Sequence, residues 1–438
     1  MSALARYFKR QGVSVCGYDK TPTALTEQLQ TEGMEIHFDD DITKIPAGID
    51  LIIFTPAVPK ELNEYQHLLK SGILIKKRAE ILGELTKDKK TIAVAGTHGK
   101  TTVSALIAHL LTHSGIGCNA FLGGISKNYH TNLLTSDNSE WMVVEADEYD
   151  KSFLQLHPDI GIITSADADH LDIYGNLESL RTTFEQYASN IKNKGILILK
   201  NGVDLDLKDL VNKKIVQYSK TIPTDFHAEN IRFENEKYVF DFITPDKALP
   251  DVVSGLPGEV NIENAIAAMT AAHLAGVKDE ALKSGLATFT GMERRFDIQV
   301  KTDKVIYIDD YAHHPEEIRA TVSSVRKMYP SKKITGIFQP HLFSRTRDFA
   351  NEFARSLELL DEIILLPIYP AREKPIEGVN SEMLLDRIHK KEKMICTKEN
   401  LVSIIAEKNI EVLMTLGAGD IDQLVNPIKN YLLKAVAK

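Results

Sequence analysis

The segment Gly96-Thr97-His98-Gly99-Lys100-Thr101-Thr102 has the residue types of a loop that binds polyphosphate. The apolar run 91–95 precedes it and a segment with apolar residues on one helical face follows it, so we expect a strand, the loop and a helix. Glycines let the backbone approach the anion, and N–H groups at the helix start face it. Lys100 is placed to reach the terminal phosphates and Thr101 to ligate Mg²⁺. The prediction is nucleotide binding, and the alternative is a purely structural turn.

Two clusters of acidic residues follow two other apolar runs. Glu145, Asp147, Glu148 and Asp150 come at the end of 141–145, and an Asp-Ala-Asp-His run that includes His170 follows 160–164. Carboxylates this close repel one another unless a cation neutralises them, and Mg²⁺ prefers oxygen ligands. Ligands of open α/β sheets bind at the carboxyl ends of strands. We therefore predict a metal site where these clusters and the phosphate loop meet, although each cluster alone also fits a solvated turn.

The elements that must position these residues are short strands alternating with helices, which predicts mostly parallel α/β sheets. Residues 230–244 alternate apolar and polar residues around a polar centre, which predicts an antiparallel hairpin. Charged stretches at 84–90 and 294–304 divide the chain into three expected domains, 1–88, 89–297 and 298–438. The expected strands are 13–18, 51–54, 91–95, 141–145, 160–164, 195–199, 305–309, 334–338, 363–367 and 411–416.

The composition excludes several classes of protein. A net charge of −9 over 438 residues disfavours a protein that coats nucleic acid. No stretch approaches the roughly 20 apolar residues of a transmembrane helix. Cys16, Cys118 and Cys396 lie too far apart for a metal motif or a disulfide framework, which indicates a reducing compartment. The basic first ten residues lack a following apolar core, so an ordinary amphipathic helix is expected rather than a cleaved signal.

Several motifs in order give the chain a family resemblance. The segments GTHGKTT, EADEYD and DADHLDIYG resemble those of the ATP-dependent Mur ligases of peptidoglycan precursor synthesis. The segment Phe338-Gln339-Pro340-His341, with the later Ser-Arg-Thr-Arg-Asp run at 344–348, resembles the branch that joins L-alanine to UDP-N-acetylmuramate. The resemblance spans essentially the whole chain. Further matching segments are Asn261-Ile262-Glu263-Asn264-Ala265, Arg294-Arg295-Phe296-Asp297, Asp309-Asp310-Tyr311-Ala312-His313-His314-Pro315, 369–373 and 417–421.

The resemblance implies three α/β domains and one reaction. Residues 1–88 would form a Rossmann-like domain for the UDP-sugar, 89–297 a P-loop ATPase-type domain with a mostly parallel sheet, and 298–438 a Rossmann-like domain for the amino acid and for closing on ATP. The implied reaction is amide formation through an acyl phosphate. It implies ATP and Mg²⁺ as cofactors and UDP-N-acetylmuramate and L-alanine as substrates. No nucleic acid partner is implied, and a cytoplasmic monomer or homodimer is expected.

The family's residue roles transfer to matching positions. Lys100, with Mg²⁺ on Thr101 and Glu145, would neutralise the phosphates, and His170 resembles a ligand of a second Mg²⁺. His313 or His314 would accept the proton of the amine or orient it, because imidazole titrates near neutral pH. The remaining implied contacts are Asn261 and Asn264 near adenine, Arg295 and Asp310 closing the ATP site, Arg345 first and Arg347 second for the amino acid carboxylate, and His341 for substrate.

For the UDP-sugar, the strand end at Asp19 fits either a ribose hydroxyl or a helix cap, and Thr55 and Ala57 lie in a segment resembling the family's nucleotide-sugar loop. The family's usual first strand and its glycine turn are absent before the opening segment, so we expect weak UDP-sugar binding. Other departures are Val94 where the full P-loop pattern has Gly, Val260 where many relatives have His, Leu342 where many have Arg, and Glu185 near the position where sister ligases carry a carbamylated Lys.

Four other interpretations stay open from the sequence. A recycling ligase would attach a preformed tripeptide to the same sugar nucleotide, and the 338–348 segment argues against it. A folylpolyglutamate synthetase is disfavoured by the motifs of both outer domains. A nucleotide-binding chain without catalysis is disfavoured by the intact Lys100, Glu145 and His170. A switch NTPase would leave the C-terminal motifs unexplained.

Overall fold

The computed structural model describes residues 1–168, 171–371 and 373–436. The chain forms two compact units. Unit 1 contains residues 1–231, 239–253 and 263–289, and unit 2 contains residues 232–238, 254–262 and 290–438.

The first part of unit 1 contains four short strands in two separate parallel pairs. β1 (Cys16–Tyr18) pairs with β2 (Glu35–His37), and β3 (Leu51–Phe54) pairs with β4 (Leu74–Lys77). Only the last half of the strand expected at 13–18 forms, and the two pairs do not join into one sheet among the described residues. The accompanying helices are α1 (Ser2–Arg10), α2 (Ala24–Thr31), the 3-10 turn η1 (Ile42–Lys44), α3 (Asn63–Lys70) and α4 (Arg78–Lys87).

Helices α1 and α4 pack onto the rest of unit 1 through apolar side chains. Leu4, Ile81 and Leu82 are buried in the same core cluster as Phe121 and Val144 of the central sheet. The buried Arg6 of α1 donates to Glu32, which follows α2, and at 2.8 Å to Asn132 of β7 (Thr131–Leu134). Burial of apolar area and a hydrogen-bonded Arg therefore fix α1 against the sheet.

The centre of unit 1 is a ten-stranded sheet. Its strand order is β14-β13-β12-β11-β10-β9-β5-β8-β6-β7. Every neighbouring pair from β12 to β6 in this order is parallel. Parallel strands covered on both faces read as continuous apolar runs, which explains why the sequence identifies them. The bounds are β5 (Lys90–Ala95), β6 (Asn119–Ser126), β7 (Thr131–Leu134), β8 (Trp141–Glu145), β9 (Ile160–Ile163), β10 (Ile196–Lys200), β11 (Lys214–Ser219), β12 (Phe226–Glu234), β13 (Lys237–Ile243) and β14 (Ala248–Val253).

The hairpin expected at 230–244 is confirmed as β12 and β13. The connecting residues Asn235 and Glu236 have φ values of 50° and 61°, as the two central residues of a type I′ turn require.

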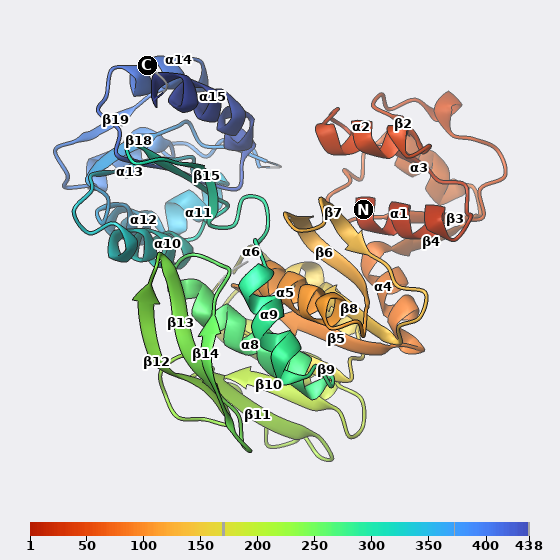
Figure 1. The fold of residues 1–438 in the computed structure, drawn as a ribbon. Coiled ribbons are helices and arrows are strands. Elements are labelled where there is room, and N and C mark those ends of the chain that lie inside the picture. Colours follow the sequence, from red (N-terminus) through yellow and green to blue (C-terminus); the bar gives the residue numbers. More distant parts are fainter. Residues whose placement is uncertain (169–170, 372, 437–438) are drawn as a thin grey trace. The chain divides into compact units, whose positions relative to one another are not determined.

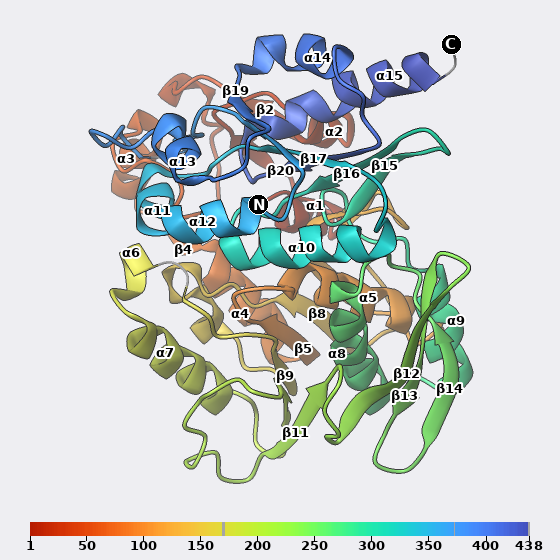
Figure 2. The ribbon, with the colours of Figure 1, turned by 90° about the vertical axis from the view of Figure 1, so that its left-hand side faces the viewer.

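Helices cover both faces of the central sheet. Figure 2 shows α7 (Leu177–Ser189) on one side of the central strands and α8 (Val260–Leu274) on the other. Phe184 and Tyr187 of α7 lie in one core cluster with Ala93 and Ala95 of β5, and the Tyr187 hydroxyl donates to Ala93 O at 2.8 Å. α5 (Lys100–His113) packs beside α9 (Asp279–Thr288) (Figure 1), and η2 (Tyr149–Gln155) and α6 (Leu171–Tyr174) follow β8 and β9.

Unit 2 is built on a six-stranded sheet of order β15-β16-β20-β17-β18-β19. All of its pairs are parallel except β15–β16. The strands are β15 (Asp297–Lys301), β16 (Ile306–Asp310), β17 (Ile334–Phe338), β18 (Glu362–Leu365), β19 (Lys393–Ile395) and β20 (Val412–Leu416). The helices are α10 (Pro315–Met328), α11 (Phe343–Asp348), α12 (Ala350–Leu357), α13 (Ser381–Arg387), α14 (Lys398–Ala406), η3 (Asp420–Leu424) and α15 (Val425–Val436).

Every strand expected from the sequence forms within a few residues of its predicted place. The polar segments that follow β5, β8, β9, β16 and β17 therefore leave the carboxyl ends of parallel strands, where ligands of such sheets bind. Among the residues that the structure describes, no helix combines the length and the apolar character needed to span a bilayer.

Candidate active site

The phosphate loop has the expected order of strand, loop and helix. β5 ends at Ala95, and α5 begins at Lys100 with Gly99 as its N-terminal flanking residue at φ 84°. Gly96 has φ 136°, which L side chains rarely adopt. The N–H groups at the start of a 14-residue helix thus follow the loop directly, and such an end binds anions.

Residues after β9 brace this loop. Ser165 Oγ accepts from the His98 N–H at 2.8 Å and lies 2.9 Å from Thr97 Oγ1. Thr164 Oγ1 donates to Ala95 O at 3.2 Å and also to His98 O. The loop conformation is therefore held by side-chain hydrogen bonds from these two residues.

Asn264 also lies against the loop. A Cβ atom added at Gly99 would lie 2.8 Å from Asn264 Oδ1, so this predicted nucleotide residue reaches the loop within unit 1. Asn261, one helical turn earlier in α8, belongs to unit 2, where its Nδ2 donates to Pro257 O at 2.7 Å.

Lys100 makes its contacts within the protein. Its Nζ donates to Gly96 O at 2.7 Å and to Glu148 Oε1 at 2.8 Å, and Glu148 Oε2 lies 2.7 Å away. Glu148 is 1% exposed and the Lys100 side chain 13%. Burial opposes the charge on Lys100, but the carboxylates of Glu148, Asp147 and Glu145 outweigh it and raise the pKa of Lys100. Burial also raises the pKa of Glu148.

Thr101 and Glu145 supply oxygen atoms beside the loop. Thr101 Oγ1 donates to Glu145 Oε2 at 3.0 Å and to Oε1 at 3.1 Å. A hydroxyl and a carboxylate in contact are hard oxygen donors that fit Mg²⁺. His170 lies outside the described residues, and within residues 1–168, 171–371 and 373–436 no three His, Cys, Asp or Glu side chains are arranged as a metal cluster. The metal prediction therefore depends on Thr101 and Glu145.

Gly123 makes room for the Glu145 carboxylate. A Cβ atom at Gly123 would overlap Oε2 of Glu145 and lie 2.8 Å from its Cδ. Gly123→Ala is therefore expected to push the carboxylate aside while the strand stays intact, and to raise the Mg²⁺ concentration for half-maximal activity about 10–100-fold. Mg²⁺ titration of ATP-dependent turnover measures this.

The control is Gly17→Ala, whose new methyl group meets only Ile36 Cδ1 at 3.7 Å. It should leave the Mg²⁺ requirement unchanged. If the Gly123→Ala enzyme had the same Mg²⁺ requirement as the original, this would contradict the assignment of Glu145 as a Mg²⁺ ligand.

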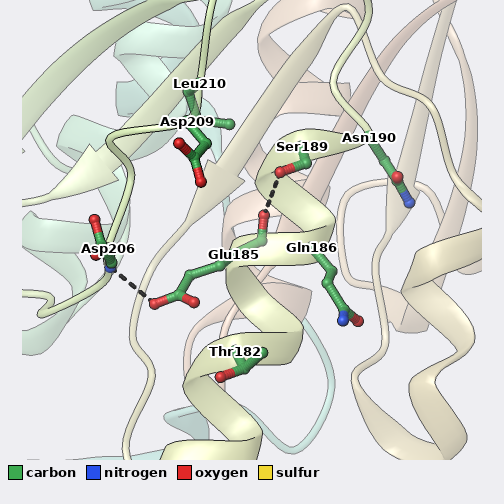
Figure 3. A pocket seen from close by; sticks show the side chains of 8 residues that line it. All are labelled: Thr182, Glu185, Gln186, Ser189, Asn190, Asp206, Asp209 and Leu210. Carbon is green, nitrogen blue, oxygen red and sulfur yellow. Dashed lines mark hydrogen bonds between the residues drawn. The ribbon is translucent and has the colours of Figure 1, made fainter.

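Glu185 lies away from the phosphate loop. Its Oε1 accepts from the Asp206 N–H at 2.8 Å, and it lines a pocket of about 260 Å³ with Thr182, Gln186 and Asp209 (Figure 3). The buried face of α7 contains Phe184 and Tyr187 instead. Glu185 therefore lies on a different side of α7 from its buried residues.

In unit 2, Asp310 holds the segment that precedes β15. Its carboxylate accepts from the Phe296 and Ala312 N–H groups, both at 2.7 Å. Burial raises the pKa of Asp310 to about 6, although Arg295 and these N–H groups lower it. Arg294 and Phe296 have φ values of 61° and 47°, so the carboxylate stabilises a backbone conformation that costs energy.

Two arginines flank the ring of Tyr311. The guanidinium carbons of Arg294 and Arg295 lie 5.1 and 4.8 Å from the ring centre, within cation–π range. Arg294 also donates to Gly417 O at 2.6 Å and lies 3.3 Å from Asp309 Oδ2. Arg295, the predicted ATP-site residue, is thus held beside the carboxyl end of β16.

A row of rings continues from Tyr311. His313 packs edge-on against Tyr311 and against His341, with ring centres 5.2 and 5.8 Å apart, and His341 stacks on Tyr369 at 5.7 Å. Two of the predicted substrate residues, His313 and His341, therefore lie together above β16 and β17.

The two neighbouring histidines differ in their hydrogen bonds. His313 Nδ1 lies 3.0 Å from Tyr311 O, which only accepts, so Nδ1 is the donor and Nε2 the basic nitrogen of neutral His313. His314 Nδ1 accepts from the Glu316 N–H at 3.4 Å and caps α10, so the proton of neutral His314 is on Nε2. His314 is 5% exposed, and its ring packs against Phe349.

Arg345 and Arg347 lie in different environments on α11. Arg345 is 7% exposed, whereas Arg347 is exposed and its Nε donates to Asp348 at 2.7 Å. Leu342, the residue that precedes this helix, has φ 70°, an uncommon value for a branched side chain. The assignment of Arg345 first, and Arg347 second, to the carboxylate of the amino acid stays a prediction.

The predicted UDP-sugar residues lie at two strand ends of unit 1. Asp19 is exposed after β1, and its Oδ1 accepts from the Thr21 N–H at 3.2 Å. Thr55 follows β3, and its Oγ1 accepts from the Ala57 N–H at 3.3 Å. Both side chains order their own turns, and their role toward a ligand stays a prediction.

Sequence reasoning missed four residues that shape the site. Glu148 was visible only as one acid in a run, Thr164 and Ser165 only as part of a strand end, and Gly123 gave no signal. Glu148, Thr164 and Ser165 act on residues 48–69 positions away, and Gly123 acts on Glu145 of another strand, which no local pattern specifies.

Comparisons with known proteins agree with this geometry. Residues 1–90, 94–272 and 294–421 match the descriptions "Mur ligase family, catalytic domain", "Mur ligase middle domain" and "Mur ligase, glutamate ligase domain". A UDP-N-acetylmuramate–L-alanine ligase of Parabacteroides distasonis is 51% identical, covering 100% of this chain and 96% of the relative. One of Phocaeicola vulgatus is 50% identical over 99% and 96%.

Solved structures show the same fold. The UDP-N-acetylmuramate-alanine ligase MurC of Thermotoga maritima superposes with a TM-score of 0.85 at 27% identity, covering 99% of this chain and 97% of that chain. A murein peptide ligase of Psychrobacter arcticus gives 0.73 at 22% identity, covering 99% and 96%, which shows the fold alone. The predicted three-domain α/β class is confirmed. This chain belongs to the Mur ligase family.

Proposed function

We propose that the chain joins L-alanine to UDP-N-acetylmuramate with ATP, through an acyl phosphate, in the synthesis of peptidoglycan precursors. Full-length relatives at 51% and 50% identity have this activity in their names. The structural observation that carries the proposal is the phosphate loop with Lys100 at its end and the Thr101–Glu145 pair beside it. Because ATP and nucleotide sugars are cytoplasmic metabolites, we place the reaction in the cytoplasm.

The phosphate site would bind and neutralise the nucleotide. Backbone N–H groups of the loop and the start of α5 face the anion, and Lys100 adds a positive charge. Thr101 and Glu145 would hold Mg²⁺, which spreads positive charge over the transferring phosphoryl group. A carboxylate is a poor electrophile, and phosphorylation gives it a leaving group that the amine can displace. We assign residues 1–88 to the UDP-sugar, 89–297 to ATP and 298–438 to the amino acid.

The amine of L-alanine must lose a proton before it attacks. His313 presents a basic Nε2 beside His341, whereas Nδ1 of His314 is engaged in capping α10. We therefore assign proton acceptance to His313 and helix capping to His314. The buried Arg345 fits the carboxylate of the amino acid, because a guanidinium forms two parallel hydrogen bonds with it.

The two histidines are expected to respond differently to substitution. His313→Ala should lower kcat about 10²-fold and leave the melting temperature nearly unchanged, because it removes a general base. His314→Ala should cost about 1 kcal/mol of stability through loss of the cap, with a smaller loss of kcat. Steady-state kinetics across pH and thermal melting of both variants test this. The reverse pattern would return the proton-accepting role to His314.

Product analysis tests the proposed function directly. The protein is incubated with MgATP and UDP-N-acetylmuramate, and L-alanine, glycine, L-serine or a tripeptide is added separately. Phosphate release with a UDP-N-acetylmuramoyl-L-alanine product in mass spectrometry is the expected result. A product formed only with the tripeptide would instead make the chain a recycling ligase, and ATP binding without any product would contradict ligation.

A further inference from the structure

Glu148 contacts the ammonium group of Lys100, which is the group expected to bind the phosphates of the nucleotide. Both carboxylate oxygens lie within 2.8 Å of Lys100 Nζ, whose other hydrogen bond goes to Gly96 O of the loop itself. An ammonium has three donors, and Gly96 O and Glu148 already take two of them. A phosphate that takes more than the third donor must therefore replace Glu148 or Gly96 O.

The turn after β8 fixes Glu148 in this place. The Lys151 N–H donates to Glu148 O at 2.9 Å, and the Tyr174 hydroxyl donates to the same carbonyl. Asp150 and Lys151 both have positive φ, at 54° and 55°, so the turn keeps an unfavourable conformation. The carboxylate is thus positioned by its backbone and is 1% exposed.

Lys100 is under the influence of several carboxylates. Glu148, Asp147 and Glu145 all favour its charged form, and Glu148 is in direct contact with the ammonium. Two buried partners of opposite charge hold each other firmly, because neither is solvated by water. A nucleotide must therefore overcome Glu148 twice, by displacing it from Lys100 and by approaching its charge.

We propose that Glu148 is a positioning residue that competes with nucleotide phosphate for Lys100 and thereby sets the affinity for ATP. The proposal rests on the proposed function only in that ATP is the ligand. Glu148 holds Lys100 against Gly96 O. When the phosphates enter, Lys100 exchanges the carboxylate for them.

Glu148→Gln removes the charge and keeps the shape of the side chain. The expected result is that MgATP and MgADP bind about 5–50-fold more tightly in calorimetry and that KM for ATP falls by a similar factor. Adenosine, which lacks phosphate, should bind unchanged. A purely structural role would weaken all three ligands, and unchanged or weaker MgATP binding would overturn the proposal.

Glu140→Gln is the matched control. Glu140 precedes β8, and its exposed Oε2 pairs with Lys90 Nζ at 2.8 Å rather than with Lys100. It loses the same charge and should leave MgATP affinity within about twofold. An equal gain in both variants would mean that the loss of a negative charge acts nonspecifically, which contradicts competition for Lys100.

A double-mutant cycle with Lys100→Met shows whether Glu148 acts through Lys100. Glu148→Gln should tighten MgATP binding much less in the Lys100→Met background than in the original chain. An undiminished gain there would mean that Glu148 repels phosphate directly, which overturns the proposal. If Glu148→Gln folds poorly, Glu148→Asp draws the carboxylate back by about one bond length and should tighten binding by a smaller factor.

These measurements separate the inference from the proposed function. They need no UDP-sugar and no amino acid, so a chain that binds MgATP but makes no product still tests Glu148. If the chain bound no MgATP, both the proposed function and the inference on Glu148 would be overturned.

Discussion

Lys100→Met is expected to reduce ATP-dependent ligation about 10³-fold, which corresponds to about 4 kcal/mol of transition-state stabilisation. The ammonium is held at the end of the phosphate loop, 2.7 Å from Gly96 O, where charge develops during phosphoryl transfer. Methionine matches the length of the side chain but carries no charge. Initial rates at saturating ATP measure the loss.

The same substitution is expected to lower stability. It leaves Glu148 buried without its cation, and breaking one side of a buried pair costs about 3–5 kcal/mol. Burial raises the pKa of Glu148, so the folded state binds a proton more readily than the unfolded state. The stability deficit should therefore be largest at high pH and shrink as the pH falls through that raised pKa, because protonation removes the unpaired charge. Thermal melting from pH 8 to pH 6 measures this.

A double variant separates the two effects. Lys100→Met with Glu148→Gln removes both charges, so it should regain most of the lost stability and stay inactive. Lys90→Met is the control, because Lys90 is exposed and pairs with Glu140 at the surface. It should change neither rate nor melting temperature measurably. An active Lys100→Met enzyme would show that the reaction does not need Lys100.

Gly96→Ala is expected to damage both folding and nucleotide binding. Gly96 has φ 136°, and an added Cβ would overlap Thr164 Oγ1 and lie 2.9 Å from Ser165 N and 3.0 Å from Thr164 N. Backbone atoms cannot move aside cheaply, so we expect a loss of about 2–4 kcal/mol and a KM for ATP at least 10-fold higher. Urea unfolding and steady-state kinetics measure the two effects.

Gly202→Ala isolates the steric part of this loss. Gly202 also has a positive φ, 88°, but an added Cβ there meets nothing within 4 Å. It should cost only about 1 kcal/mol from the backbone and leave the KM for ATP unchanged. Equal losses in both variants would show that the brace from Thr164 and Ser165 does not shape the loop.

The sequence located the strands of both sheets well because parallel strands covered on two faces are continuous apolar runs. It missed β2, β4, β7 and β19, which are three or four residues long and only partly buried. It also missed β6, β11, β14 and β15, which are longer but have exposed or half-buried positions among the buried ones. Such strands owe their existence to pairing with a neighbour, for example β4 with β3. A short segment has no periodicity to reveal this.

The phosphate loop could be predicted from the sequence, since its seven residues and the flanking strand and helix are contiguous and each has a local pattern. The family could be predicted as well, through motifs in a fixed order. Tertiary structure alone decided which acid of Glu145-Ala146-Asp147-Glu148 meets Lys100 and which meets Thr101, across 48 and 44 positions of chain. It also decided that His314 caps a helix while His313 faces His341. Contacts of this kind depend on strand register and on the turn after each strand, and residue type alone does not fix either.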